Sequence, residues 1–181
     1  MKKTILLILL PVFCYGYRLP QTQDIPYQPY DIQSFFVKHD CFLATYPIAG
    51  ILPSDIIRKY CFANNVNPKW VLARMQTERC LISGKVDGNY FIIPGQRKRL
   101  KIVLRECCGY GLSWSYNGHK LNPKQYLGFV NQVSHCAKFM SVNLKTRGIK
   151  QALRHYDPTV NKYDGVELFC NVWYSLFQEK K

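Results

Sequence analysis

The segment NPKWVLARMQTERCLIS, residues 67–83, most constrains the fold because it predicts a short, well-capped helix with a carboxylate beside its apolar stripe. Asn67 can cap the helix, and Pro68 fits the first turn, where a proline loses no intrahelical hydrogen bond. At roughly 100° per residue, one narrow stripe holds Val71, Met75 and Ile82. Glu78 lies about 20° from Val71, at the edge of that stripe. We therefore expect its carboxylate to face protein.

Two interpretations of Glu78 follow from its surroundings. Its place near the end of the helix and its partial burial both disfavour ionisation, which would raise its pKa and suit a proton donor. Arg74, four residues earlier, and the adjacent Arg79 oppose that shift if they reach the carboxylate. The second interpretation is a structural salt bridge between Glu78 and Arg74 at helical spacing.

Apolar residues recur at helical spacing along most of the remaining chain, which predicts a mostly α fold. Residues 89–95 are expected to form a tight loop or short strand. Further helices are predicted at residues 55–64 behind a Ser54 cap, 96–108, 122–147, 149–156, and from Asp164 onward with Glu167 completing a capping box.

The N-terminus has the pattern of a secretory signal peptide over residues 1–16, with two lysines, a short apolar run and small residues before the cleavage point. We expect a periplasmic or secreted protein without stable membrane insertion, because no apolar run approaches the ~20 residues of a membrane span. A lipid anchor on Cys14 is the alternative. Residues 17–40 are expected to form an extended arm, and residues 41–181 a single domain.

The chain is strongly basic, with a formal net charge of +14 that falls to +12 when Lys2 and Lys3 leave with the signal. Such a charge favours an anionic partner. Nucleic acid, anionic lipid and cell-wall polymer all qualify, but export favours the wall and argues against nucleic acid. We expect a monomer that binds the wall.

Seven cysteines remain after residue 16, and an oxidising compartment favours their pairing into disulfides that staple the domain. The odd count predicts one unpaired thiol, and the neighbours Cys107 and Cys108 are expected to bond to different partners. Zinc is the competing explanation, but the chain has no Cys-x-x-Cys pair and its histidines are scattered. We therefore expect no metal and no cofactor.

Three stretches then occur in order: VNPKWVLARMQTERCLIS, CCGYGLS and QYLGFVNQVSHCAKFM. Together they resemble the soluble lytic transglycosylase and goose-type lysozyme superfamily, particularly its bacterial branch of exported glucosaminidase-like proteins. The resemblance covers roughly residues 54–176 and implies a lysozyme-like helical domain. The implied partner is the glycan strand of peptidoglycan.

The resemblance also implies roles for individual residues. Glu78 matches the catalytic glutamate, and the Gly-Tyr-Gly segment from Gly109 matches a stretch that lines the cleft. Gln132 matches the glutamine of a Gly-Phe-x-x-Gln helix start at Gly128. The implied substrate-binding residues are Gln76, Tyr110, Gly111, Leu112, Ser113, Gln132 and Tyr156.

Glycoside cleavage usually needs a general acid and a second carboxylate about 5–9 Å away. The sequence offers three candidates for that second group: Glu106, Asp87 and Asp157. Members of the resembled family use one glutamate as acid and then base, while the substrate's N-acetyl group and 6-hydroxyl complete the chemistry and leave a 1,6-anhydro sugar. Aromatic rings suited to sugar stacking are Tyr90, Tyr110, Trp114, Tyr116 and Tyr156.

Two rival functions stay open at this point. A cysteine hydrolase would use Cys107 or Cys108 as nucleophile and His119 or His135 as base. A non-catalytic wall-binding or inhibitor protein would keep the lysozyme-like fold and the basic charge without turnover.

Overall fold

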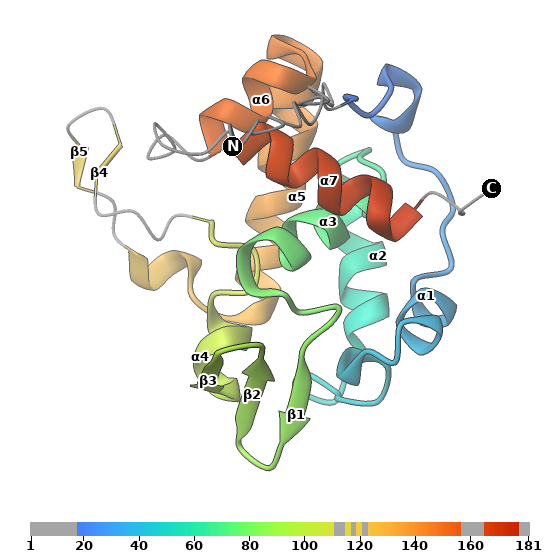
Figure 1. The fold of residues 1–181 in the computed structure, drawn as a ribbon. Helices are drawn as coiled ribbons and strands as arrows, with labels where there is room; N and C mark the ends of the chain where they lie inside the picture. The colour runs from blue at the N-terminus through green and yellow to red at the C-terminus, as the bar shows by residue number, and fades with distance from the viewer. Residues whose placement is uncertain (1–17, 111–114, 117–118, 121–122, 157–164, 178–181) are drawn as a thin grey trace, which may run out of the picture.

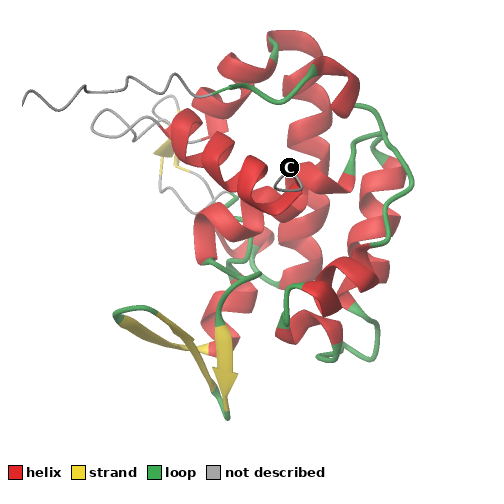
Figure 2. Cartoon of the chain, turned by 45° about the vertical axis from the view of Figure 1, so that its right-hand side comes forward, coloured by secondary structure: helices red, strands yellow, loops and turns green. Residues whose placement is uncertain are grey.

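The computed structural model describes residues 18–110, 115–116, 119–120, 123–156 and 165–177, so the predicted signal peptide lies outside it. The described chain is mostly helical, as predicted, with one small antiparallel sheet (Figures 1 and 2). Its helices are α1 (Ile32–Lys38), α2 (Pro53–Ala63), α3 (Pro68–Arg79), α4 (Leu100–Arg105), α5 (Phe129–Arg147), α6 (Ile149–Tyr156) and α7 (Gly165–Phe177). The sheet has the order β1 (Lys85–Asp87), β2 (Tyr90–Ile93), β3 (Gln96–Arg99), and a separate pair joins β4 (Ser115–Tyr116) to β5 (His119–Lys120).

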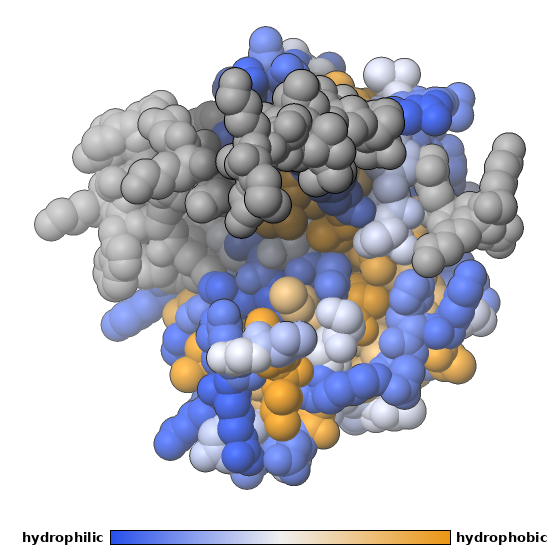
Figure 3. Space-filling model, in the orientation of Figure 1, coloured by the Kyte–Doolittle hydropathy of each residue, from blue (hydrophilic) through white to orange (hydrophobic). Residues whose placement is uncertain are grey.

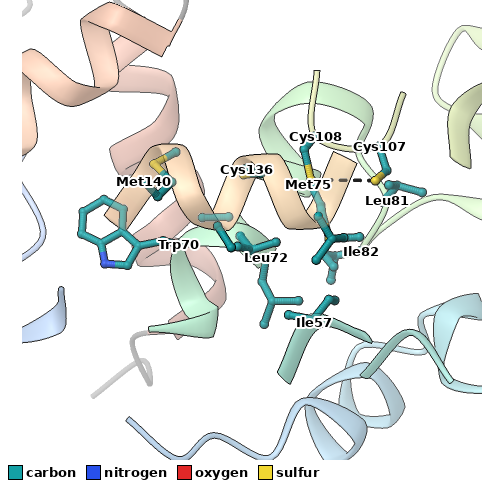
Figure 4. Close-up of a cluster of buried hydrophobic side chains, with 14 of the residues drawn as sticks. Ile57, Trp70, Leu72, Met75, Leu81, Ile82, Cys107, Cys108, Cys136 and Met140 are labelled. Carbon is teal, nitrogen blue, oxygen red and sulfur yellow. Dashed lines mark hydrogen bonds between the residues drawn. The ribbon is translucent and has the colours of Figure 1, made fainter. Parts of the chain in front are cut away.

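Helix α3 is the central element, because it packs against α2, α5 and α7. Trp70 stacks on Phe169 of α7 with ring centroids 5.6 Å apart, and Figure 4 shows Trp70, Leu72 and Met75 within the buried cluster. Every residue from Trp70 to Met75 is buried, so α3 is enclosed on nearly all sides rather than along one stripe. The sequence therefore located the central helix but understated how deeply it is buried.

Both ends of α3 are fixed by side chains. The Asn67 side chain accepts a hydrogen bond from the Lys69 N–H (3.1 Å), as predicted. The helix stops at Arg79, four residues before the predicted end, because Cys80 adopts a left-handed conformation (φ 53°). The amide oxygen of Gln76 then accepts the backbone N–H groups of Ile82 and Ser83, which holds the chain in this turn.

The predicted helix over residues 96–108 is wrong in its first part. Gly95, at φ 75°, closes a tight turn that pairs Ile93 with Gln96, so residues 96–99 continue a hairpin as β3. Helix α4 begins only at Leu100, where the chain re-enters the core. The apolar residues at helical spacing begin only at Leu100, and hairpin pairing with β2 makes residues 96–99 a strand.

Three other boundaries also differ from the prediction. The N-terminal arm is not fully extended, because Asp31 caps α1 by accepting the Ser34 N–H (2.9 Å). Helix α2 begins at Pro53, and the Ser54 hydroxyl donates to the Gln33 side chain instead of capping. Helix α5 begins at Phe129, because Gly128 (φ 101°) interrupts the helical path and donates its N–H to the carbonyl of Arg105.

The seven cysteines from Cys41 to Cys170 are all thiols in this structure, so the expected disulfide staples are not shown. Four buried cysteines interact with one another: Cys108 contacts Cys107 with sulfur atoms 3.8 Å apart and also hydrogen-bonds Cys136, which interacts with Cys61. Within the described residues, no helix combines the length and apolar character needed to cross a bilayer.

Candidate active site

Glu78 lies in the last turn of α3, where its carboxylate forms an ion pair with the guanidinium of Arg74. The Arg74 side chain is 5% exposed and that of Glu78 is 20% exposed, so the pair sits at the boundary between the core and the surface. This confirms that the carboxylate is partly buried. It also confirms the salt bridge expected for the structural interpretation of Glu78.

Gly109 lies directly against the Glu78 carboxylate. A Cβ atom added to Gly109 would lie 2.7 Å from Glu78 Cδ, closer than side-chain atoms approach one another. Gly109 also has φ 68°, which L residues with a side chain rarely adopt. Its N–H donates to the carbonyl of Glu106 (2.9 Å), which closes a turn after α4. The backbone conformation therefore favours glycine here, and a side chain at this position would displace the Glu78 carboxylate.

Gln132, in the first turn of α5, holds this loop in place. Its amide oxygen accepts the N–H groups of Cys108 (3.2 Å) and Tyr110 (3.0 Å), on either side of Gly109. Its amide nitrogen donates to the carbonyls of Tyr110 and Tyr126, both at 2.8 Å. Gln132 is fully buried, so the structure gives it the task of positioning the loop, whereas the resemblance gave it contact with substrate.

Tyr110 extends the loop surface next to Gly109. Its ring stacks on His135 of α5 with centroids 5.6 Å apart and meets Tyr126 edge-on at 5.3 Å. Burial, reinforced by Tyr126 and Cys136, raises the pKa of the Tyr110 phenol, so the ring is neutral well into the alkaline range. A neutral ring held by aromatic neighbours, one residue from the glycine that meets Glu78, is suited to contact with a sugar.

Glu106 is the second carboxylate that the fold brings to this end of α3. Arg79 donates to Glu106 Oε2 (3.0 Å), and Arg105 donates to Oε1 (2.9 Å). Of the other two candidates, Asp87 pairs with Arg97 on the sheet, and Asp157 lies outside the described residues. Sequence reasoning did not anticipate the arginine pair around Glu106, because Arg79 and Glu106 are 27 positions apart.

The remaining predicted site residues divide into three groups. Gln76 uses its amide in the turn after α3, where its nitrogen donates to the Ser83 hydroxyl (2.8 Å). Tyr156 ends α6, and Tyr116 belongs to β4, but their side chains are not described. Outside the described residues lie Gly111, Leu112, Ser113 and Trp114.

Cys107 and Cys108 lack the surroundings of a nucleophilic cysteine. Cys107 and Cys108 are fully buried, and burial raises the pKa of the Cys108 thiol well above its usual value. Reactive cysteines have lowered pKa values and access to solvent. His135 stacks on Tyr110, and the side chain of His119 is not described. The part of the chain that the structure describes contains no cluster of metal-binding side chains.

Comparison of the chain with family models finds no match, and comparisons with curated proteins and with solved structures find none either. The candidate site therefore rests on Glu78, Arg74, Gly109 and Gln132 and on their contacts.

Proposed function

We propose that this protein is a peptidoglycan-cleaving glycosidase, a lytic transglycosylase or a lysozyme-like muramidase, in which Glu78 is the catalytic acid and base. The observation that carries the proposal is the contact between Glu78 and Gly109. A partly buried carboxylate is held on one side by Arg74 and lies against Gly109, in a loop whose backbone Gln132 holds by hydrogen bonds. A reacting carboxylate needs neighbours that fix its position, and Arg74 and the loop held by Gln132 supply them.

In this reaction Glu78 protonates the glycosidic oxygen as the bond to the anomeric carbon breaks. The resulting carboxylate then takes the proton of the sugar's own 6-hydroxyl, whose oxygen closes on the anomeric carbon, or takes a proton from water in the hydrolytic variant. Tyr110 would contact the sugar. Arg74 stabilises the ionised carboxylate, which lowers the fraction of Glu78 that is protonated before the first step and makes the carboxylate a weaker base in the second.

The second candidate function is a non-catalytic wall-binding or inhibitor protein with the same fold. The ion pair with the buried Arg74 favours it, because that contact alone accounts for a glutamate at this position. Its basic charge would bind the wall without turnover.

We further propose that the protein is exported, periplasmic or secreted, and that some of its thiols then pair. Cys107 and Cys108 are disfavoured as a pair, because adjacent Cα atoms lie about 3.8 Å apart and disulfides usually span ~4.4–6.8 Å. Cys108 and Cys136 already share a hydrogen bond and are the favoured pair. Their disulfide would attach the Gly109 loop to α5.

The test of the catalytic proposal is Glu78→Gln, which keeps the shape of the side chain and removes its transferable proton. We expect loss of peptidoglycan cleavage with unchanged circular dichroism and unchanged binding to purified sacculi. Mass spectrometry of the wild-type digest separates internal attack, which leaves anhydro ends, from hydrolysis, which leaves reducing ends. Wild-type protein that binds sacculi but releases no fragments would support the non-catalytic alternative.

A further inference from the structure

A run of positive charge follows β3 and α4. The ten residues from Gln96 to Arg105 contain five cations and no carboxylate. All five are exposed, and we call them the basic track: Arg97, Lys98, Arg99, Lys101 and Arg105. Figure 3 shows hydrophilic side chains gathered around a small hydrophobic patch in the lower part of the molecule, over the sheet.

The sheet presents part of this track beside apolar surface. Arg97 pairs with Ile92 and Arg99 with Tyr90 across β2 and β3, so these four side chains share one face. The Arg97 guanidinium lies 4.2 Å from the Tyr90 ring centre, and its other partner is Asp87. Among the described residues, Lys98, Arg99 and Lys101 have no carboxylate partner. Their charge is available to a ligand.

The track leads to Glu78. Lys101 and Arg105 are four residues apart and lie on the same exposed side of α4. Arg105 contacts Glu106, whose carbonyl accepts the Gly109 N–H, and Gly109 lies against the Glu78 carboxylate. Figure 1 shows β3 and α4 on the same side of the molecule as the end of α3.

We propose that the basic track binds the carboxylates of the peptide stems on peptidoglycan and thereby directs a glycan strand toward Glu78. This inference rests on the proposed function. The partner is a polyanion because five cations occur in one run of sequence without a carboxylate. It carries apolar surface because Tyr90 and Ile92, on the sheet face of Arg97 and Arg99, are each more than a third exposed. A neutral glycan such as chitin would offer no anionic group to Lys98, Arg99 and Lys101.

The experiment compares two variants of equal net charge. The track variant carries Lys98→Gln, Arg99→Gln and Lys101→Gln, none of which breaks an ion pair of the described residues. The control variant carries Lys38→Gln, Lys59→Gln and Lys150→Gln, which are exposed on other helices. Binding is measured by sedimentation with native sacculi and with sacculi whose stem carboxylates have been amidated.

We expect the track variant to bind native sacculi roughly tenfold more weakly at low salt, since three exposed charge contacts are lost. The control variant should bind nearly as wild type, and amidated sacculi should not distinguish the variants. Where cleavage is measured, KM should rise and kcat should stay unchanged.

The proposal would be overturned if both variants lost the same affinity for native sacculi, or if the track variant also bound amidated sacculi more weakly than wild type. It would be overturned likewise if the track variant bound sacculi as wild type but lost binding to phosphatidylglycerol vesicles. Binding to sacculi is measured independently of cleavage. If the Glu78→Gln experiment contradicts the proposed catalysis, the binding experiment still tests the basic track.

Discussion

Replacing Gln132 by methionine tests whether this residue holds the site together. The substitution keeps the length and approximate volume of the side chain but removes both amide functions. Two N–H groups, of Cys108 and Tyr110, lose their acceptor, and two carbonyls, of Tyr110 and Tyr126, lose their donor.

The size of the effect follows from burial. A buried polar group without a partner costs about 1–3 kcal/mol. Gln132 and Cys108 are fully buried, so the Cys108 N–H bears that cost, whereas the Tyr110 and Tyr126 groups are partly exposed and can recruit water. We therefore expect Gln132→Met to lower the free energy of unfolding by about 2–4 kcal/mol, a large share of the ~5–15 kcal/mol typical of a domain.

Urea denaturation followed by circular dichroism measures this change, and hydrogen exchange should show faster exchange at residues 107–110. The neighbouring Asn131→Leu is the matched control, because its amide donates only to the Leu127 carbonyl on an exposed surface. That control should stay within about 0.5 kcal/mol of wild type. If Gln132→Met also stays within that range and exchange at residues 107–110 is unchanged, Gln132 does not hold the loop.

Three further predictions follow from the same contacts. Gly109→Ala should lower the free energy of unfolding more than Gly95→Ala does, as measured by urea denaturation. Both glycines have positive φ, which costs an alanine about 1–2 kcal/mol, but only Gly109 lies against Glu78. Equal losses in the two variants would contradict this close contact. Trp70→Ala should destabilise by about 3–5 kcal/mol in the same assay, because the ring is fully buried between Phe169 and Trp173. Burial, and to a smaller extent the charge of Lys138, lowers the pKa of His135 below 6.5 in the folded protein. The stabilisation by neutral His135 is therefore complete above pH 6.5 and is lost as the pH falls through the folded-state pKa. His135→Phe should flatten that part of the stability profile, and an unaltered profile would refute the assignment.

The sequence predicted those features that are decided within a few residues. Asn67 and Pro68 start α3 because a cap and an N-terminal proline act locally, and the Arg74 to Glu78 spacing places the two charges on one side of a helix. Pairing between elements could not be predicted this way. Residues 96–99 were expected to begin a helix, yet their pairing with β2 across the turn at Gly95 makes them a strand.

The same limit applies to the candidate site. Gly109 meets Glu78 across 31 positions of chain, and Gln132 reaches Cys108 across 24. Single-sequence patterns do not encode such contacts. The resemblance identified Gln132 through its motif, but only the fold shows that its amide forms hydrogen bonds with the backbone of the loop.

The ion pair with Arg74 gives the sharpest test of what Glu78 does. A general acid must carry a proton, and a neighbouring guanidinium favours the ionised carboxylate. If Glu78 is the acid, Arg74→Met should shift the alkaline limb of the pH–activity profile to higher pH, because the neutral acid then persists further. Since the Glu78 side chain is 20% exposed, its carboxylate can be solvated by water in Arg74→Met. That variant should therefore lose less stability than a protein in which a fully enclosed ion pair is broken.

Arg79→Met is the matched control for that shift, because Arg79 lies next to Glu78 in the chain but directs its guanidinium to Glu106. Its profile should keep the wild-type alkaline limb if Glu78 alone supplies the proton. A shift in Arg79→Met without one in Arg74→Met would instead make Glu106 the titrating group. If the alkaline limb of the pH–activity profile is unchanged in both folded variants, neither carboxylate donates the proton. Glu78 would then be a structural partner of Arg74 in a binding protein.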